Sequence, residues 1–171
     1  MIRTTSNLRR IALVLGCSAT FALVTSVRAE APPTAQQVQF AQRSSDLMLA
    51  TLFAALLQEF AETTPANVAE GKHSISLIFD DRNESMRLVG MQQPLRENDL
   101  PQDPFETTAL ERATRGEGFT AVEKVEGKWA YRRSVALSNF HAACGMCHTN
   151  FGPVNANQWV GALMLRVPVS E

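Results

Sequence analysis

Cysteine is scarce in this chain, which has only Cys17, Cys144 and Cys147 among its 171 residues. Cys17 lies near the N-terminus, and Cys144 and Cys147 are separated by only two residues. So few thiols in these positions exclude the framework of several disulfides that holds many small secreted domains together. Cys144 and Cys147 therefore belong to one local motif.

Long apolar runs are also scarce, and the longest one lies near the start of the sequence. A basic stretch precedes an almost uncharged apolar run at residues 11–24, and residues 27–29 suit signal-peptidase cleavage. This order is typical of a secretion signal, and the run is shorter than the ~20 residues that a transmembrane helix needs. We therefore predict that residues 1–29 are a cleaved signal peptide, with an uncleaved anchor as the alternative. A lipoprotein cleavage site at Cys17 is disfavoured because the apolar run continues beyond it.

Neither sign of charge is in large excess, since the sequence has 16 lysine and arginine residues and 17 aspartate and glutamate residues. The predicted signal contains four arginines and no acidic residue, so residues 30–171 carry 12 basic and 17 acidic side chains, a net charge of −5. A moderately acidic chain of this length predicts one domain with a single core and disfavours nucleic acid as a partner. Because no later apolar run is long enough to cross a membrane, we expect a soluble domain in the periplasm.

The two remaining cysteines frame the segment Cys144-Gly145-Met146-Cys147-His148. Thiols at this spacing can each add to one of the two vinyl groups on a haem edge, and a histidine directly after the second thiol can reach the iron. We therefore predict one covalent haem c, with Cys144 and Cys147 as thioethers and His148 as the proximal iron ligand. Haem attachment to such motifs outside the bacterial inner membrane agrees with the predicted export.

Two other uses of this motif are less favoured. A zinc site needs two further ligands, and the remaining histidines of residues 30–171 are His73 and His141, with no other cysteine. A thioredoxin-like dithiol would leave His148 without a role, and the motif does not follow a strand of a βαβ unit.

The ligand on the opposite face of the iron is not fixed by the pattern. The candidate donors are His73, His141, Met86, Met91, Met146 and Met164. Most methionines in such a chain are packing residues, and an open sixth position is a further alternative.

Other side chains are candidates for the haem surroundings. Arg132, Arg133 and Arg166 lie on predicted strands and could pair with the haem propionates, although solvated cations are equally common there. Aromatic candidates for the pocket lining are Tyr131, Phe140 and Trp159, for which ordinary core packing is the alternative.

The first half of the domain predicts two helices and a hairpin. Apolar residues recur at helical spacing over residues 34–62, which indicates one long amphipathic helix. A proline near its start and a glycine at its end mark a short second helix at residues 65–71. Alternating apolar residues at 75–79, a polar turn at 80–83 and a short apolar run at 86–91 predict a β-hairpin.

The second half predicts a capped helix and three strands. Asp103 is followed by proline and, three residues later, by glutamate, and Gly116 ends the helical pattern. Strands are expected at residues 120–125, 128–137 and 158–167. The fold class is therefore α+β, with an antiparallel sheet of about five strands and a long N-terminal amphipathic helix.

Several of these pieces, in this order, resemble one known family. They are the long helix, Asp103-Pro104-Phe105-Glu106, Tyr131-Arg132, the motif from Cys144 to His148, and Gly161-Ala162-Leu163-Met164. The chain resembles the periplasmic haem c domains with a PAS-like sensor fold that were first described in a cyanobacterial haem protein. The resemblance implies a PAS-like sheet for residues 30–171.

The chain also departs from that family. Members often carry an upstream cysteine that supplies a second axial ligand, and often a glycine directly after the haem histidine. Here residues 30–143 contain no cysteine, and Thr149 follows His148. The resemblance therefore implies a different sixth ligand, for which His73 is preferred because it is a strong donor in roughly the corresponding region.

The motif and the resemblance together predict a periplasmic monohaem cytochrome-like protein. We expect it to transfer one electron, or to report redox state, to a redox partner or a separate signalling protein. The alternative is a sensor that binds NO, CO or O2 at an open sixth position. A small haem enzyme is less favoured because no acid–base constellation accompanies the motif. The long apolar helix face could also form a homodimer.

Overall fold

The computed structural model describes residues 31–80, 85–93 and 97–169, so the predicted signal peptide lies outside the described residues. The elements in chain order are α1 (Ala35–Glu62), α2 (Val68–Asp80), β1 (Met86–Gly90), the 3-10 turn η1 (Glu97–Asp99), α3 (Pro104–Ala113), β2 (Phe119–Val125), β3 (Lys128–Asn139), α4 (Ala142–Cys147), the 3-10 turn η2 (Thr149–Phe151) and β4 (Asn155–Pro168).

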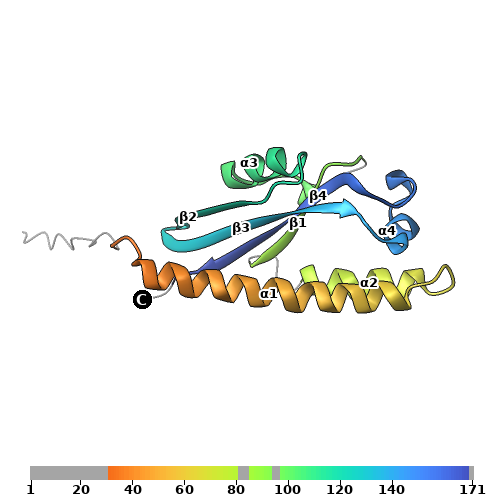
Figure 1. Cartoon of the computed structure of the whole chain (residues 1–171), viewed down its shortest axis with the longest axis horizontal. Coiled ribbons are helices and arrows are strands. Elements are labelled where there is room, and N and C mark those ends of the chain that lie inside the picture. Colours follow the sequence, from red (N-terminus) through yellow and green to blue (C-terminus); the bar gives the residue numbers. More distant parts are fainter. Residues whose placement is uncertain (1–30, 81–84, 94–96, 170–171) are drawn as a thin grey trace, which may run out of the picture.

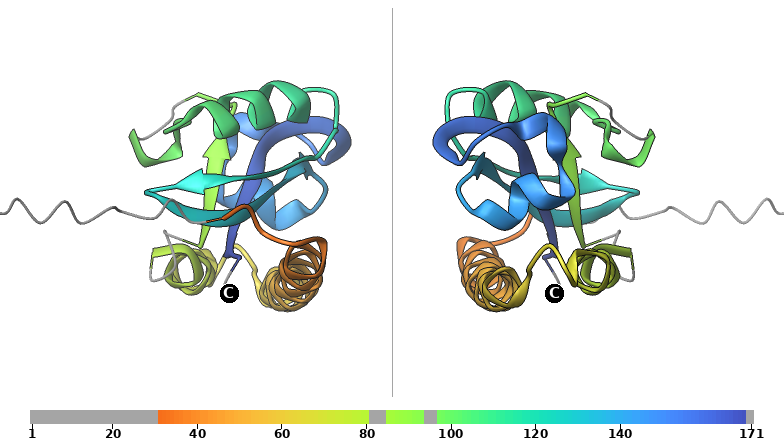
Figure 2. Two further views of the ribbon diagram at one scale, coloured as in Figure 1. Left: turned by 90° about the vertical axis from the view of Figure 1, so that its left-hand side faces the viewer. Right: turned by 90° about the vertical axis from the view of Figure 1, so that its right-hand side faces the viewer.

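One antiparallel sheet, with the strand order β1-β4-β3-β2, forms the middle layer of the domain. Helices α1 and α2 lie side by side beneath one face of the sheet, and α3 covers the other (Figures 1 and 2). Helix α4 lies at the end of the sheet where β3 finishes (Figure 1). The predicted α+β class and the long N-terminal helix are confirmed, but the sheet of the described residues has four strands and not five.

The missing strand is the segment at residues 75–79, which belongs to α2 and was wrongly predicted as the first strand of a hairpin. Ile75, Ile78 and Phe79 pack against the core shared by α1 and the sheet, while Leu77 is 49% exposed. The spacing of the packed residues is helical, although residues 75, 77 and 79 also alternate as a strand would. The predicted polar turn lies mostly outside the described residues.

The second helix also continues through Gly71, where the sequence pattern predicted its end. A Cβ atom at this position would lie 2.6 Å from the hydroxyl oxygen of Thr63. Gly71 therefore allows α2 to approach the end of α1 closely, and its presence reflects helix packing rather than a helix stop.

Helix α1 is the longest element, with 28 residues. The side chain and backbone N–H of Thr34 exchange hydrogen bonds with Gln37 in a capping box. One face, which includes Leu49, Leu52 and Leu56, packs against Met86, Leu163 and Leu165 of the sheet. No helix in the described part of the chain is long and apolar enough to cross a membrane.

Helix α3 is held on the opposite face by a buried cluster of charges. The Asp103 carboxylate accepts a hydrogen bond from the backbone N–H of Glu106 and one from Arg132, at 2.9 and 2.7 Å. Glu106, only 3% exposed, lies within ion-pair distance of Arg87 and Arg132, at 3.5 and 3.7 Å. The Arg132 guanidinium also covers the ring of Phe105 at 4.2 Å. These contacts fix the start of α3 on the sheet.

The same contacts keep Asp103 ionised. Partial burial acts to raise the pKa of Asp103, but the hydrogen bonds from Arg132 and from the backbone N–H of Glu106 outweigh it. The pKa of this carboxyl therefore lies below its ordinary value of 3.8.

The substitution Glu106→Gln tests the buried cluster. It removes one negative charge from between two buried guanidinium groups, so the free energy of unfolding should fall by about 3 kcal/mol. Urea unfolding followed by circular dichroism measures the loss. Glu117→Gln is the matched control, because the Arg115–Glu117 pair is solvent-exposed, and it should leave stability almost unchanged. Equal effects of the two substitutions would contradict a stabilising role for the cluster.

Candidate functional site

Helix α4 presents the two cysteines of the motif on one side. Cys144 and Cys147 are free thiols of intermediate burial and are three residues apart on this short helix, so their side chains point in similar directions. The backbone N–H of Cys144 donates to the carbonyl of His141 at 3.0 Å, and that of His148 donates to the carbonyl of Cys144 at 2.8 Å. The motif is therefore a single helical turn that ends at the histidine.

His148 lies at the exposed C-terminal end of this turn. Its ring stacks on Phe151 with centroids 4.5 Å apart and planes 7° apart. The backbone N–H of Phe151 donates to the carbonyl of His148 at 2.9 Å, and the side chain of Asn150 donates to the carbonyl of Gln93 at 2.6 Å. The imidazole thus rests on η2, which is itself tied to the segment after β1.

Asn139 organises the segment that follows the motif. This side chain is fully buried at the end of β3, and its amide nitrogen lies 2.9 Å from the carbonyl oxygen of Pro153 and 3.2 Å from Oε1 of Gln158. The carbonyl oxygen of Phe151 is 3.3 Å from the same nitrogen. Asn139 was not predicted as a site residue, since its signal in the sequence is only a polar residue at the end of an apolar strand.

His141 connects the motif to α1. Its Nδ1 accepts a hydrogen bond from the backbone N–H of Ala143 at 3.2 Å, which caps α4, and its ring stacks on Phe60 with centroids 5.5 Å apart. Phe60 also lies near Phe140, with centroids 6.1 Å apart. The side chain of His141 is therefore already engaged in capping and stacking in this arrangement.

Burial affects the thiol of Cys144. Desolvation is the largest influence on Cys144 and raises the pKa of its thiol above the ordinary value of 9.0. This thiol is therefore protonated at neutral pH, which makes it a poor nucleophile towards small oxidants.

The candidates for the sixth ligand are spread over the molecule. Met86 is buried between the sheet and α1, whereas Met91 and Met164 pack on the α3 side. His73 is exposed on α2. It is two positions, or about 200° around the helix, from the packed Ile75, which places it on the face turned away from the sheet. His73 stays a prediction as the sixth ligand, because no observation tests it.

The three candidate arginines have different surroundings. Arg132 is held by the buried cluster beneath α3, where Glu123 also accepts a hydrogen bond from it at 2.9 Å. Arg133, the next residue, points to the other face and pairs with Asp46 and Ser45 of α1. Arg166 lines a cavity of about 210 Å³ that it shares with Arg132 and Glu106. Of these three arginines, only Arg133 faces α1, the helix whose Phe60 stacks on His141 just before the motif.

A preformed cluster of metal ligands is not seen in the described residues. Within residues 31–80, 85–93 and 97–169, no group of three or more histidine, cysteine, aspartate or glutamate side chains is arranged to hold a metal ion. What the motif does offer is two free thiols on one helical side and an adjacent exposed imidazole.

The substitution Asn139→Ala tests how the motif is supported. It removes buried hydrogen bonds to the carbonyl groups after η2, so we expect the free energy of unfolding to fall by about 2 kcal/mol. Hydrogen exchange at residues 149–158 should become faster, as measured by mass spectrometry. Asn155→Ala is the control, since Asn155 makes an exposed local hydrogen bond to Asn157. Unchanged exchange after Asn139→Ala would show that the segment is held by other contacts.

Comparison with protein-family models and with curated proteins finds no match. The resemblance to the periplasmic haem c domains therefore stays a prediction that depends on the motif and on the order of the elements.

Proposed function

We propose that this chain is a periplasmic monohaem c-type protein, with the haem bonded to Cys144 and Cys147 and His148 as the proximal ligand of its iron. The observation that carries the proposal is the placement of two free thiols and one exposed imidazole on a single turn of α4. This donor set fits a haem because two thiols can form the two thioether bonds and one imidazole can bind the iron. The PAS-like sensor architecture is part of the same proposal and is supported by the family resemblance.

The bound haem would supply a one-electron change at its iron. The residues of this chain fix its position and its surroundings. Cys144 and Cys147 hold one edge against α4, and the stack of His148 on Phe151 sets the direction of the imidazole. The exposure of His148 and of η2 leaves this end of the molecule accessible to a redox partner or a signalling protein. We assign the chain electron transfer or redox reporting and no catalytic step.

The alternative function is binding of a diatomic gas at an open sixth position. The arrangement of the candidate donors favours it, because Met86 and Met164 are packed in the core on opposite faces of the sheet and His73 is on the outward face of α2. A sixth ligand from His73 would need α2 to present its outward face to the motif. The coordination of the iron therefore separates the two functions.

Covalent attachment is the first prediction. Expression in a bacterial periplasm with a c-type haem maturation system should give a protein whose mass includes one haem after denaturation. Replacing both thiols, by Cys144→Ser with Cys147→Ser, should abolish the added mass because no thioether can form. Absence of covalent haem from the parent protein would contradict the proposed function.

The same preparation tests His73 through the optical spectrum of the iron. If His73 is the sixth ligand, the parent is low-spin and His73→Ala becomes high-spin, while the neighbouring control Lys72→Ala does not change. A high-spin parent whose reduced form binds carbon monoxide would instead support the gas-binding alternative. A low-spin spectrum that survives His73→Ala would rule out His73 as the ligand.

We further propose that two copies associate through the outward face of α1. Phe40, Leu47, Ala54 and Ala61 recur every seven residues on this face, and Phe40 and Leu47 are 71% and 70% exposed. We call these four residues the outer stripe. Residues 47–58 contain no charge, so α1 is apolar on both of its faces.

Charge favours a second copy as the occupant of the outer stripe. Arg43 and Asp46 lie before the uncharged segment, and Glu59 and Glu62 lie after it. Asp46 is paired with Arg133 of the same copy, so Arg43 is the charge that this end offers to a second copy. In an antiparallel pair of α1 helices, the basic end of one copy meets the acidic end of the other. The alanines of the stripe also permit a close approach of the two helices.

The substitution Leu47→Lys should disrupt this homodimer, because it places a charge in the centre of the outer stripe. We expect the dimer dissociation constant to rise at least tenfold, or about 1.4 kcal/mol, in sedimentation equilibrium experiments. Val154→Lys is the control, since Val154 is an exposed apolar residue on a distant loop. A parent protein that stays monomeric at all concentrations would contradict the proposal.

A further inference from the structure

Three arginines from neighbouring strands share the α3 face of the sheet. Arg87 of β1 and Arg132 of β3 both approach Glu106 at the start of α3. Arg166 of β4 is directly opposite Arg132 in the strand register, so its side chain leaves the sheet on the same face. Like charges at directly opposite positions destabilise a sheet unless negative groups lie close to them. The positive charge of this face therefore needs negative partners.

The carboxylates near these arginines are already engaged by other groups. Asp103 accepts hydrogen bonds from Arg132 and from the backbone N–H of Glu106. The Oε2 atom of Glu106 accepts a hydrogen bond from the backbone N–H of Gln102 at 2.8 Å. Glu126 is exposed in the turn between β2 and β3. Most of the negative charge is therefore committed to Arg132 and to the start of α3.

Arg87 and Arg166 are balanced less completely. Arg87 is 7% exposed, and its Nη2 donates to the carbonyl oxygens of Asn98 and Leu100 at 2.7 and 2.8 Å. Its Nε and Nη1, like Nε of Arg132, are buried and have no hydrogen-bond acceptor among the described residues. In the same part of the chain, no hydrogen bond or ion pair is made by the guanidinium group of Arg166. Buried charged donors without an acceptor are strongly destabilising, so such groups usually mark the place of a bound water or ion.

All three arginines line one cavity of about 210 Å³. Since one water molecule occupies about 30 Å³ of the liquid, this cavity can hold a molecule of several heavy atoms. Met164, which is buried and packs with the core beneath α3, also lines the cavity and supplies an apolar wall. The cavity therefore combines positively charged donors with an apolar surface.

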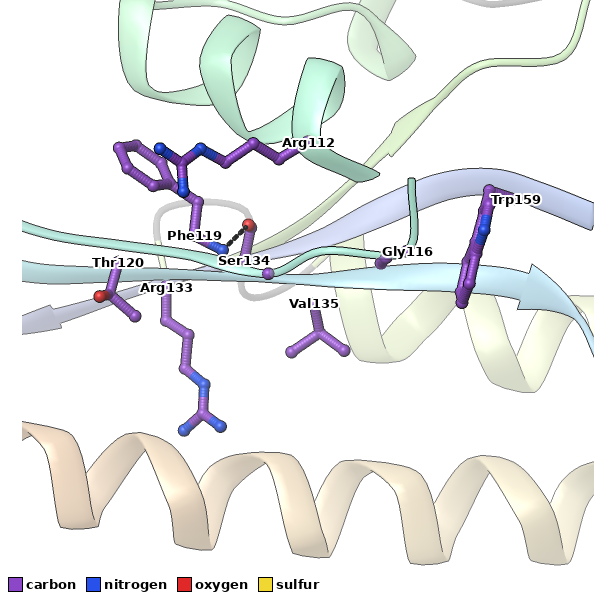
Figure 3. A pocket seen from close by; sticks show the side chains of 10 residues that line it. Arg112, Gly116, Phe119, Thr120, Arg133, Ser134, Val135 and Trp159 are labelled. Atoms are coloured by element: carbon purple, nitrogen blue, oxygen red, sulfur yellow. Dashed lines mark hydrogen bonds between the residues drawn. The ribbon is translucent and has the colours of Figure 1, made fainter. Parts of the chain in front are cut away.

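A larger cavity at the start of β2, of about 490 Å³, lacks such convergence. Figure 3 shows Arg112 beside the ring of Phe119 on the α3 side of the sheet, while Arg133 extends from the other side toward α1. The two guanidinium groups thus point away from each other, and that of Arg133 already pairs with Asp46. Of these two cavities, the smaller one gathers its arginines on one face of the sheet.

We propose that the smaller cavity binds a small organic carboxylate. The anionic group of this ligand accepts hydrogen bonds from the unpaired N–H groups of Arg87 and Arg166, and its short apolar part contacts Met164. Guanidinium groups suit such a ligand, because they form strong charge-assisted hydrogen bonds with carboxylate oxygens.

This site is separate from the proposed haem. Arg132 is seven residues before Asn139 on β3, which places it about 24 Å from the end of the strand that leads to α4. Binding of the carboxylate therefore does not depend on the assignment of the cysteine motif.

Isothermal titration calorimetry with sodium butyrate tests the site in the purified protein. We expect saturable binding at neutral pH, because butyrate joins one carboxylate to a short apolar chain. Arg166→Gln should raise the dissociation constant about tenfold, since it removes one guanidinium charge and leaves the contacts of Arg87 and Arg132 in place. Arg115→Gln is the matched control, because Arg115 is exposed, pairs with Glu117 and does not line the cavity.

Other anions distinguish a carboxylate site from a general anion site. Sodium chloride and sodium phosphate at the same ionic strength should not compete with butyrate. Absence of butyrate binding, equal affinity of the parent and of Arg166→Gln, or equally tight binding of phosphate would overturn the inference. Circular dichroism checks that the variant is folded.

Hydrogen exchange with mass spectrometry locates the ligand in the parent protein and needs no variant. Butyrate should slow exchange at residues 98–106, because Arg87 holds two carbonyl groups of this segment and Glu106 lines the cavity. Protection confined to residues 142–151 would place the ligand at the cysteine motif and overturn the inference. A protein that carries no haem but binds butyrate in this cavity would contradict the proposed function alone.

Discussion

The unequal lengths of two neighbouring strands determine how this domain is organised. Strand β3 has 12 residues and β2 has 7, so the hairpin that joins them leaves the end of β3 without a partner on one side. That unsupported end leads directly into α4 and brings His141, the cap residue of α4, onto Phe60 of α1. This end pairs with β4 through two register shifts, at 137/138 and 138/139, and the buried Asn139 holds the chain that returns after the motif. The candidate site is therefore a continuation of the sheet edge.

Local signals were sufficient for the elements whose neighbours agree with them. The capped start of α3 and the β2–β3 hairpin were predicted from Asp103, Pro104 and the turn at residues 126–127, because caps and tight turns are determined by a few adjacent residues. Residues 75–79 could not be assigned in this way. Their apolar positions fit both the 3.6-residue period of a helix and the two-residue period of a strand. Packing against the core shared with α1 stabilises the helix.

The residues of the candidate site also divide into those that the sequence could suggest and those that only the folded chain reveals. Cys144, Cys147 and His148 could be proposed as a haem site from their spacing alone, because covalent haem attachment needs that spacing. Arg132 and Arg133 could not be separated from the sequence, although one is buried beneath α3 and the other reaches α1, because the face that each residue occupies depends on the register of β3. Asn139 was missed for a related reason, since its partners are backbone carbonyls that come together only in the folded chain.

The small size of α4 has a consequence for when the motif becomes ordered during folding. With six residues it is too short to persist on its own, and its cap residue His141 stacks on Phe60 at the far end of α1. Residues 142–148 are therefore an open segment until α1 has docked on the sheet. In the unfolded chain both thiols are accessible, and the docking of α1 orders the turn that holds them. The long helix therefore completes the candidate site.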